Sequence, residues 1–143
     1  MRIALILGLL LLSPLPALAD AEANKKAVLE FYDKALNQKD FEKARAYLGD
    51  RYVQHNPNAK DGPEGLKGYI DFLRAKFPAQ HNTFRQAFAD GDYVILHVHA
   101  VREPGERGNA IVDIFRLENG KIVEHWDVVQ PIPETSANNN TMF

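Results

Sequence analysis

The stretch "NAIVDIFRLENGKIVEHWDVVQ", residues 109–130, has the pattern of two β-strands joined by a tight turn. Runs rich in β-branched and aromatic residues flank Asn119-Gly120, and Asn-Gly between such runs is a strong signal for a two-residue hairpin. One residue does not fit the pattern. Asp113 lies in the middle of the first run, where a carboxylate is unfavourable in a strand and costly to bury. The hairpin therefore raises the question of what this acid does.

The rest of the chain supplies helices first and strands afterwards. Apolar residues spaced as one helical stripe predict a helix over 23–38. Asp40 can cap a shorter second helix, and a third is expected after Gly62, with Pro63 in its first turn and Pro78 beyond its end. "TFRQAFA" and "YVILHVHAV" read as two further strands. This order predicts an α+β domain, with helices on one face of a curved antiparallel sheet.

The N-terminus has the features of an export signal. Met1 and Arg2 precede the apolar run "IALILGLLLL", and an A-x-A site follows at 17–19. The run is shorter than the roughly 20 residues that a membrane-spanning helix needs. We therefore expect a signal peptide over 1–19 with cleavage after Ala19, no membrane anchor, and a periplasmic or secreted single domain over 20–143. The chain has no cysteine, so neither a disulfide nor a lipid on a cysteine is expected.

The charge balance argues against nucleic acid as a partner. The formal net charge is −2, and removal of Arg2 with the signal peptide makes it about −3. The sequence has no basic stripe of the kind that neutralises a phosphate backbone. We expect no binding to nucleic acid.

The hairpin register bears on the position of Asp113. If Asn119 and Gly120 are the two loop residues, counting back places Asp113 opposite Trp126. Phe115 then shares the Asp113 face and lines the same surface. His125 and Asp127 fall on the opposite face, as ordinary surface or interface residues.

The next hairpin, at "REPGERG", leaves two registers open. An odd-numbered loop, such as 103–107, places His97 opposite Asp113, with His99 two residues along on the same face. An even-numbered loop turns both histidines away. In the first register, Asp113, His97, His99 and Trp126 line one concave surface.

These motifs together resemble a known family. "YVQHNP", the H-x-H strand and "VDIFRLENGKIVEHWDVVQP" are similar to the SnoaL-like polyketide cyclases of the NTF2-like superfamily, above all to a subgroup described as SnoaL-like aldol-condensation enzymes. The resemblance covers essentially the whole mature chain. It implies a cone of helices and curved sheet around a deep apolar pocket. It also implies acid–base chemistry by an aspartate, of the lyase or isomerase type, without metal or cofactor.

Residue roles follow from the resemblance. The catalytic aspartate corresponds to Asp113 and the catalytic histidine to His99. His97 occupies the place of a polar pocket residue, and His55 and Asn56 match the "QHNP" segment. These three residues, together with Trp126 and Phe115, are expected to bind substrate. The substrate implied is a small apolar compound that contains a carbonyl group. An exported chain does not match the intracellular substrates of the polyketide cyclases, which favours the aldol mechanism over the polyketide itself.

Two other functions are compatible with the same residues. The pocket can bind a small apolar ligand without chemistry, since the fold alone does not determine activity. Alternatively, His97 and His99 with a nearby carboxylate have the spacing of zinc or iron ligands on a strand. Bound metal would favour the metal enzyme. Equal ligand binding by the wild type and an Asp113→Asn variant, with no turnover, would favour the binding protein.

The predicted sheet has apolar residues on both faces, which indicates a partner. The residues whose parity is opposite to the histidines and to Asp113 are apolar: Val94, Leu96, Val98, Ala100, Ala110, Val112, Ile114, Val123 and Val129. Three helices in a small domain can cover only one side, and a bare apolar face would exceed what soluble monomers usually expose. We expect a homodimer that packs sheet against sheet about a two-fold axis.

Overall fold

The computed structural model of the chain describes the backbone of residues 16–143 and the side chains from Ala21 onward. Residues 1–15, which hold most of the predicted signal peptide, lie outside the described part. The elements in chain order are α1 (Pro16–Tyr32), the π-helix η1 (Asp33–Asn37), α2 (Phe41–Arg45), β1 (Leu48–Gln54), α3 (Gly62–Lys76), β2 (His81–Asp90), β3 (Tyr93–Val101), β4 (Asn109–Glu118) and β5 (Lys121–Pro131). The α+β order predicted from the sequence is confirmed.

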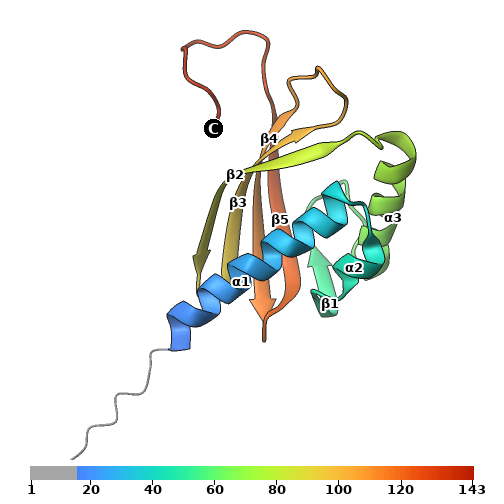
Figure 1. Cartoon of the computed structure of the whole chain (residues 1–143), viewed down its shortest axis with the longest axis vertical. Helices are drawn as coiled ribbons and strands as arrows, with labels where there is room; N and C mark the ends of the chain where they lie inside the picture. The colour runs from blue at the N-terminus through green and yellow to red at the C-terminus, as the bar shows by residue number, and fades with distance from the viewer. Residues whose placement is uncertain (1–15) are drawn as a thin grey trace, which may run out of the picture.

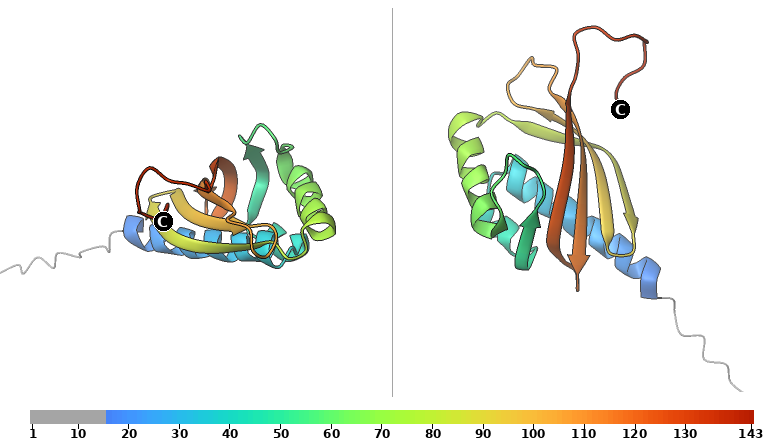
Figure 2. Two further views of the ribbon diagram at one scale, coloured as in Figure 1. Left: turned by 90° about the horizontal axis from the view of Figure 1, so that it is seen from above. Right: turned by 180° about the vertical axis from the view of Figure 1, so that it is seen from behind.

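The five strands form one curved, open sheet in the order β1-β5-β4-β3-β2. β2 to β5 pair antiparallel, and β1 joins the edge parallel to β5. α1 crosses one face of this sheet, and α3 lies beside the edge of the sheet that is formed by β1 (Figures 1 and 2). The C-terminal tail leaves β5 at its Pro131 end, loops out from the sheet and turns back (Figure 1).

Local sequence signals explain where the helices begin. The Asp40 side chain accepts a hydrogen bond from the Lys43 backbone N–H at 3.1 Å, which confirms the predicted cap of α2. Pro63 lies in the first turn of α3, as predicted. α2 ends at Arg45, and the chain is already extended at Leu48, the first residue of β1.

The hydrophobic core lies between α1 and the face of the sheet that carries Leu96 and Phe115. The fully buried side chains come from α1, from α3 and from strands β3 to β5: Val28, Tyr32, Ile70, Leu73, Val94, Leu96, Val98, Phe115, Leu117 and Ile122. Aromatic rings meet edge to face across this interface, with Phe31 and Phe115 centroids 6.0 Å apart. α1 is therefore fixed against the sheet by packing.

The β4–β5 hairpin has the predicted turn but not the predicted register. Asn119 and Gly120 both have positive φ, 52° and 73°, as a two-residue hairpin turn requires, and Glu118 pairs with Lys121. A β-bulge then shifts the register between Arg116 and Leu117. The predicted pairing of Asp113 with Trp126 is wrong: Asp113 pairs with Asp127, and Trp126 pairs with Ile114. The extra residue reverses the two faces of β5 beyond the bulge.

The β3–β4 connection takes the even-numbered form. Ala100 pairs with Asn109, so an even number of residues, 101–108, separates this last pair of the ladder, and Asp113 pairs with Leu96. Gly108 has φ 77°, and a Cβ there would collide with the Ala100 carbonyl oxygen, so this connection requires glycine at that position. His97 pairs with Val112 and His99 with Ala110. The expectation that both histidines share the face of Asp113 is therefore wrong.

The second face of the sheet, here called the outer face, differs from the predicted one. Of the strand residues expected there, Val94, Leu96, Val98 and Ala100 instead face the helices and are buried. Val123 is buried and Val129 lines the pocket described below. Val112, which is 39% exposed, does lie on the outer face. The other exposed apolar residues of this face are Phe88, Tyr93, Ile95 and Val128.

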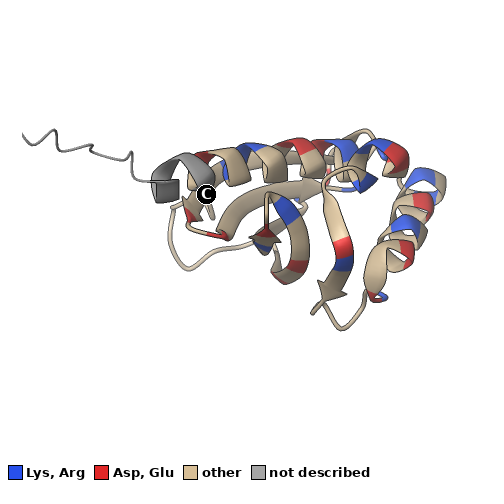
Figure 3. Cartoon of the chain, turned by 90° about the horizontal axis from the view of Figure 1, so that it is seen from below, with Lys and Arg blue, Asp and Glu red and all other residues tan. Residues whose placement is uncertain are grey.

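Charged residues are interspersed along the helices. Figure 3 shows acidic and basic positions alternating along α1 and α3. None of the helices among the described residues is long and apolar enough to cross a membrane.

Candidate functional site

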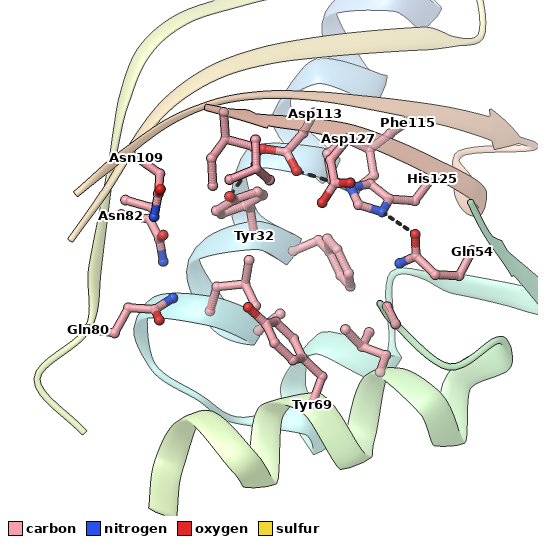
Figure 4. A pocket seen from close by; sticks show the side chains of 18 of the residues that line it. Tyr32, Gln54, Tyr69, Gln80, Asn82, Asn109, Asp113, Phe115, His125 and Asp127 are labelled. Carbon is pink, nitrogen blue, oxygen red and sulfur yellow. Dashed lines mark hydrogen bonds and ion pairs between the residues drawn. The ribbon is translucent and has the colours of Figure 1, made fainter. Parts of the chain in front are cut away.

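A cavity of about 140 Å³ lies between the helices and the inner face of the sheet. Its apolar wall includes Phe31, Leu66, Tyr69, Ile111 and Phe115. Polar side chains occupy two separate regions of the wall (Figure 4). One region contains Gln54, Asp113, His125 and Asp127, and the other contains Gln80, Asn82 and Asn109. The cavity can therefore hold an apolar molecule and contact polar groups on it.

Asp113 lies at the centre of the first region and is only 3% exposed. Its Oδ1 lies 3.1 Å from His125 Nε2, and its Oδ2 accepts a hydrogen bond from the Tyr32 hydroxyl at 3.2 Å. Burial raises the pKa of Asp113 above its ordinary value of 3.8, and the hydrogen bond to His125 and the charge of that histidine oppose this rise. The unusual acid in the strand pattern is thus a buried, hydrogen-bonded acid in the cavity wall.

The hydrogen bonds around Gln54 determine the protonation of His125 Nδ1. The Asn56 backbone N–H donates to Gln54 Oε1 at 2.9 Å, so this atom is the amide oxygen. His125 Nδ1 lies 3.0 Å from the same oxygen and must carry a hydrogen in order to donate to it. The hydrogen bond between His125 Nε2 and Asp113 Oδ1 then needs one further proton, held by either partner. Asp113 and His125 therefore form a pair that shares a proton.

Tyr32 completes the environment of Asp113. It is the last residue of α1 and directly precedes the π-helix η1, and short π-helical turns of this kind are frequent at functional sites. Burial raises the pKa of Tyr32 well above 10.0, and the charge of Asp113 and the hydrogen bond to it raise it further. The Tyr32 hydroxyl stays protonated and donates to the Asp113 carboxylate.

Asp127 is a second carboxylate in the same region. It pairs directly across the hairpin with Asp113, and both of its oxygens accept from Asn56 Nδ2, at 2.7 and 2.8 Å. Its negative charge also raises the pKa of Asp113. Asn56 therefore orients Asp127 rather than lining the cavity itself.

The same region has the donor set of a metal site. Asp113, His125 and Asp127 each offer one ligand atom, and these atoms lie within 4.8 Å of one another. Two carboxylates and an imidazole whose Nδ1–H is already bonded to Gln54 suit a divalent transition metal. These are not the ligands predicted, because His97 and His99 lie on the other side of the sheet.

His97 and His99 contact the C-terminus instead of the cavity. The Phe143 ring lies 5.1 Å from the His97 ring and 4.9 Å from the His99 ring. His99 Nε2 donates to the Arg107 carbonyl at 2.7 Å, and its Nδ1 lies 3.2 Å from an Arg85 guanidinium nitrogen. The β3–β4 register prevents both histidines from reaching Asp113.

His55 and Trp126 also lie outside the cavity. Their rings stack with centroids 4.6 Å apart, and His55 Nε2 lies 2.9 Å from Glu124 Oε1. The bulge in β5 explains why Trp126 does not reach the cavity. It turns Trp126 away from Asp113 and turns His125 and Asp127 toward the cavity in its place. Of the predicted substrate-binding residues, only Phe115 lines the cavity.

Helices and an open curved sheet that enclose a pocket containing a buried acid define an α+β pocket protein of the NTF2-like class. The model of the SnoaL-like domain family matches residues 28–125, and the chain belongs to this family. A candidate polyketide cyclase from Bacillus cereus has 22% identity and a TM-score of 0.67, over 78% of this chain and 76% of that chain. A candidate ketosteroid isomerase from Kribbella flavida has 16% identity and a TM-score of 0.66, over 87% and 90% of the two chains.

AclR, a candidate hydroxylase from Streptomyces galilaeus, has 19% identity and a TM-score of 0.65, over 79% of this chain and 82% of that chain. The three structures are named for three different candidate activities, and at identities of 22% or less their likeness to this chain establishes the fold alone. No curated protein matches the chain.

Proposed function

We propose that the chain is an exported enzyme that performs acid–base chemistry, without a cofactor, on a small apolar substrate containing a carbonyl group. The reaction is an aldol-type cyclisation or an isomerisation. The observation that carries the proposal is the buried Asp113 carboxyl in the wall of an apolar cavity, bonded to His125 and Tyr32. Removal of a proton next to a carbonyl requires such a base together with donors for the oxygen that becomes negative.

The residues divide this work. With the shared proton on His125, Asp113 is a carboxylate and accepts a proton from the carbon next to the substrate carbonyl. The electron pair of the broken C–H bond moves onto the carbonyl oxygen. Tyr69 supplies a hydroxyl donor for that oxygen, and this hydroxyl points into the cavity (Figure 4), whereas the Tyr32 hydroxyl keeps its bond to the Asp113 carboxylate. Burial raises the pKa of Tyr69 above 10.0, which keeps this donor protonated.

The reaction closes when Asp113 returns the proton. In an isomerisation the proton goes to a different carbon of the enolate. In an aldol closure the enolate carbon attacks a second carbonyl, and the proton goes to the alkoxide that forms. The class of reaction can be tested by incubating the protein with cyclohexanone in deuterated water, where catalysed exchange of the α-hydrogens reports enolate formation. Exchange no faster than in buffer would favour a binding protein without chemistry.

A metal-dependent reaction is the second candidate, because Asp113, His125 and Asp127 can converge on one ion. Tight binding of Zn²⁺ or Mn²⁺, followed by exchange activity that disappears with EDTA and returns with the ion, would support it. We expect EDTA to leave the exchange rate unchanged, since the shared proton between Asp113 and His125 already satisfies the pair without an ion.

The exchange rate should rise with pH as Asp113 loses its proton. Only the carboxylate accepts a proton from carbon, and the raised pKa of Asp113 moves this rise above 3.8. The free energy of unfolding should change with pH in the opposite direction to the exchange rate. The folded state binds the Asp113 proton more tightly than the unfolded state does, because the pKa of Asp113 is raised on folding. The Asp113 contribution to the free energy of unfolding therefore falls as pH rises from 3.8 through the folded pKa. A flat rate from about pH 4 to 8 would contradict the assignment.

We further propose that two copies pair through the outer face. The outer face carries five large apolar side chains that expose between 39% and 70% of their surface: Phe88, Tyr93, Ile95, Val112 and Val128. An exposed apolar patch of this kind is typical of a protein–protein interface. Light scattering at micromolar concentration should give twice the mass of the mature chain. Val112→Glu places a charge in this face and should yield a monomer, whereas Lys26→Glu, at an exposed position of α1, should not. A wild-type monomer would contradict the proposal.

The chain is also proposed to be periplasmic or secreted after cleavage at Ala19. The support is the basic start, apolar run and A-x-A site of residues 1–19. N-terminal sequencing of the protein from its native host should begin at Asp20. An intact Met1 would contradict export by this signal.

A further inference from the structure

The second polar region of the cavity has no part in the chemistry proposed above. Gln80 lies in the loop between α3 and β2, Asn82 is the second residue of β2, and Asn109 begins β4. Figure 4 shows these three amides on one side of the cavity, with Asp113, Asp127 and His125 on the other. Gln80 and Asn82 are 6% and 3% exposed. Such burial of neutral polar groups is costly unless something bonds to them.

The Asn82 side chain is held in a defined orientation. Asn37, in η1, accepts from the Asn82 backbone N–H at 2.8 Å, and its Nδ2 donates to the Asn82 carbonyl at 3.1 Å. These two backbone contacts identify the oxygen and nitrogen of the Asn37 amide. The same Asn37 oxygen accepts from Asn82 Nδ2 at 3.1 Å. The nitrogen of the Asn82 side chain is therefore engaged, and its oxygen is the free end.

Gln80 presents a second free oxygen. Its backbone is fixed, because its carbonyl accepts from Lys39 Nζ at 2.9 Å and its N–H donates to the Phe77 carbonyl at 3.0 Å. Its side-chain Oε1 is buried and is the one such side-chain atom without a hydrogen-bond partner among the residues that the structure describes. A buried acceptor of this kind requires an explanation, and a ligand donor in the cavity supplies one.

The charge of this region limits the ligand group further. Both carboxylates of the described cavity wall, Asp113 and Asp127, belong to the first region. The wall also includes Arg102, an exposed side chain that packs over the Phe77 ring at 4.8 Å. Acceptor oxygens without a carboxylate suit a neutral donor better than an ammonium group.

We propose that Gln80 and Asn82 form a subsite that binds a hydroxyl or amide N–H group of the substrate, at the end opposite to its reacting carbonyl. This inference rests on the proposed function for the position of that carbonyl. It narrows the substrate class to small compounds that carry a carbonyl at one end and a neutral hydrogen-bond donor at the other. A cavity of about 140 Å³ accommodates roughly one six-membered ring between the two groups.

Two ketones that differ by one hydroxyl test the subsite. NMR titration should give 4-hydroxycyclohexanone a dissociation constant about fivefold or more below that of cyclohexanone, the scale of one neutral hydrogen bond. Gln80→Met keeps the length of the side chain without the acceptor and should abolish this preference. Gln86→Met makes the same change on the exposed outer side of β2 and should preserve it. The Gln80 side-chain amide signal of the wild type should also shift more with the hydroxyketone, which requires no variant.

Equal affinity for the two ketones, a preference that survives Gln80→Met, or binding of neither ketone would overturn the subsite. These measurements report binding and are independent of turnover. A hydroxyl preference combined with α-hydrogen exchange that does not depend on Asp113 would keep the subsite and reject the proposed function. Exchange that depends on Asp113 without a hydroxyl preference would do the reverse.

Discussion

Replacement of Asp113 by Asn should lower the rate constant for α-hydrogen exchange on cyclohexanone about 100-fold or more, the usual scale of general acid–base catalysis. The amide has the shape of the carboxyl group and can still donate to His125 and accept from Tyr32, so the fold should be kept. It cannot accept a proton from carbon. The loss should therefore appear in the rate constant, while the dissociation constant of the ketone changes little.

Asp90→Asn provides the matched control, because Asp90 is an exposed aspartate at the end of β2, remote from the cavity wall. Its exchange rate should equal that of the wild type. Circular dichroism and the unfolding midpoint of the Asp113→Asn protein should show that it is folded. A folded Asp113→Asn protein with wild-type exchange would remove Asp113 from the mechanism.

Phe115→Ala should lower the free energy of unfolding by about 3–5 kcal/mol, the range for removing a buried aromatic side chain. Phe115 is 1% exposed and contacts Phe31, Tyr32 and His125, with ring centroids 6.0, 6.3 and 4.7 Å away. Its loss would leave a hole beneath Asp113, where α1 meets the sheet. Urea unfolding of the mature protein measures the effect.

Phe72→Ala is the control for this substitution, since it deletes the same atoms from a side chain of α3 that is 45% exposed. Its loss in unfolding free energy should be clearly smaller, because much of the ring already contacts water. Equal losses for the two variants would show that Phe115 is not the packing centre between α1 and the sheet.

Much of the fold follows from local sequence signals. Asp40 caps α2, and Pro63 lies in the first turn of α3, as the preferences of these residues for helix starts predict. Asn119-Gly120 readily adopts positive φ angles and so forms the hairpin turn. The unusual position of Asp113 in a strand pattern indicates a buried acid, and the structure buries it in the cavity wall. Each of these features depends on only a few neighbouring residues.

The composition of the site depends on register, which local signals fix less well. The bulge in β5 shifts the register by one residue, which brings His125 and Asp127 to the cavity face and turns Trp126 away from it. The even-numbered β3–β4 connection likewise places His97 and His99 on the outer face. A signal for the bulge exists in the adjacent apolar residues Ile122 and Val123, which interrupt the alternation and are both buried. Val123 packs on Gly49, where a Cβ would lie 2.8 Å from Val123 Cγ1. This contact across β1 and β5 is not visible in the sequence of either strand.

Tyr32 and Gln54 could not be assigned to the site from the sequence either. Tyr32 belongs to the apolar stripe of its helix, and its role depends on the hydroxyl reaching Asp113 across 81 positions of the chain. Gln54 acts through His125, whose position depends on the bulge. Both contacts join segments that are distant in sequence.

The most direct test of the central claim, that Asp113 pairs with His125, is ¹H–¹⁵N NMR of the five histidine rings in the wild type and in Asp113→Asn. We predict that the His125 Nε2 signal moves strongly in the variant, while His125 Nδ1 keeps its hydrogen through its bond to Gln54. The signals of His97 and His99, on the outer face, should stay where they are. A strong shift at His97 or His99, with His125 unchanged, would contradict the register and the site built on it.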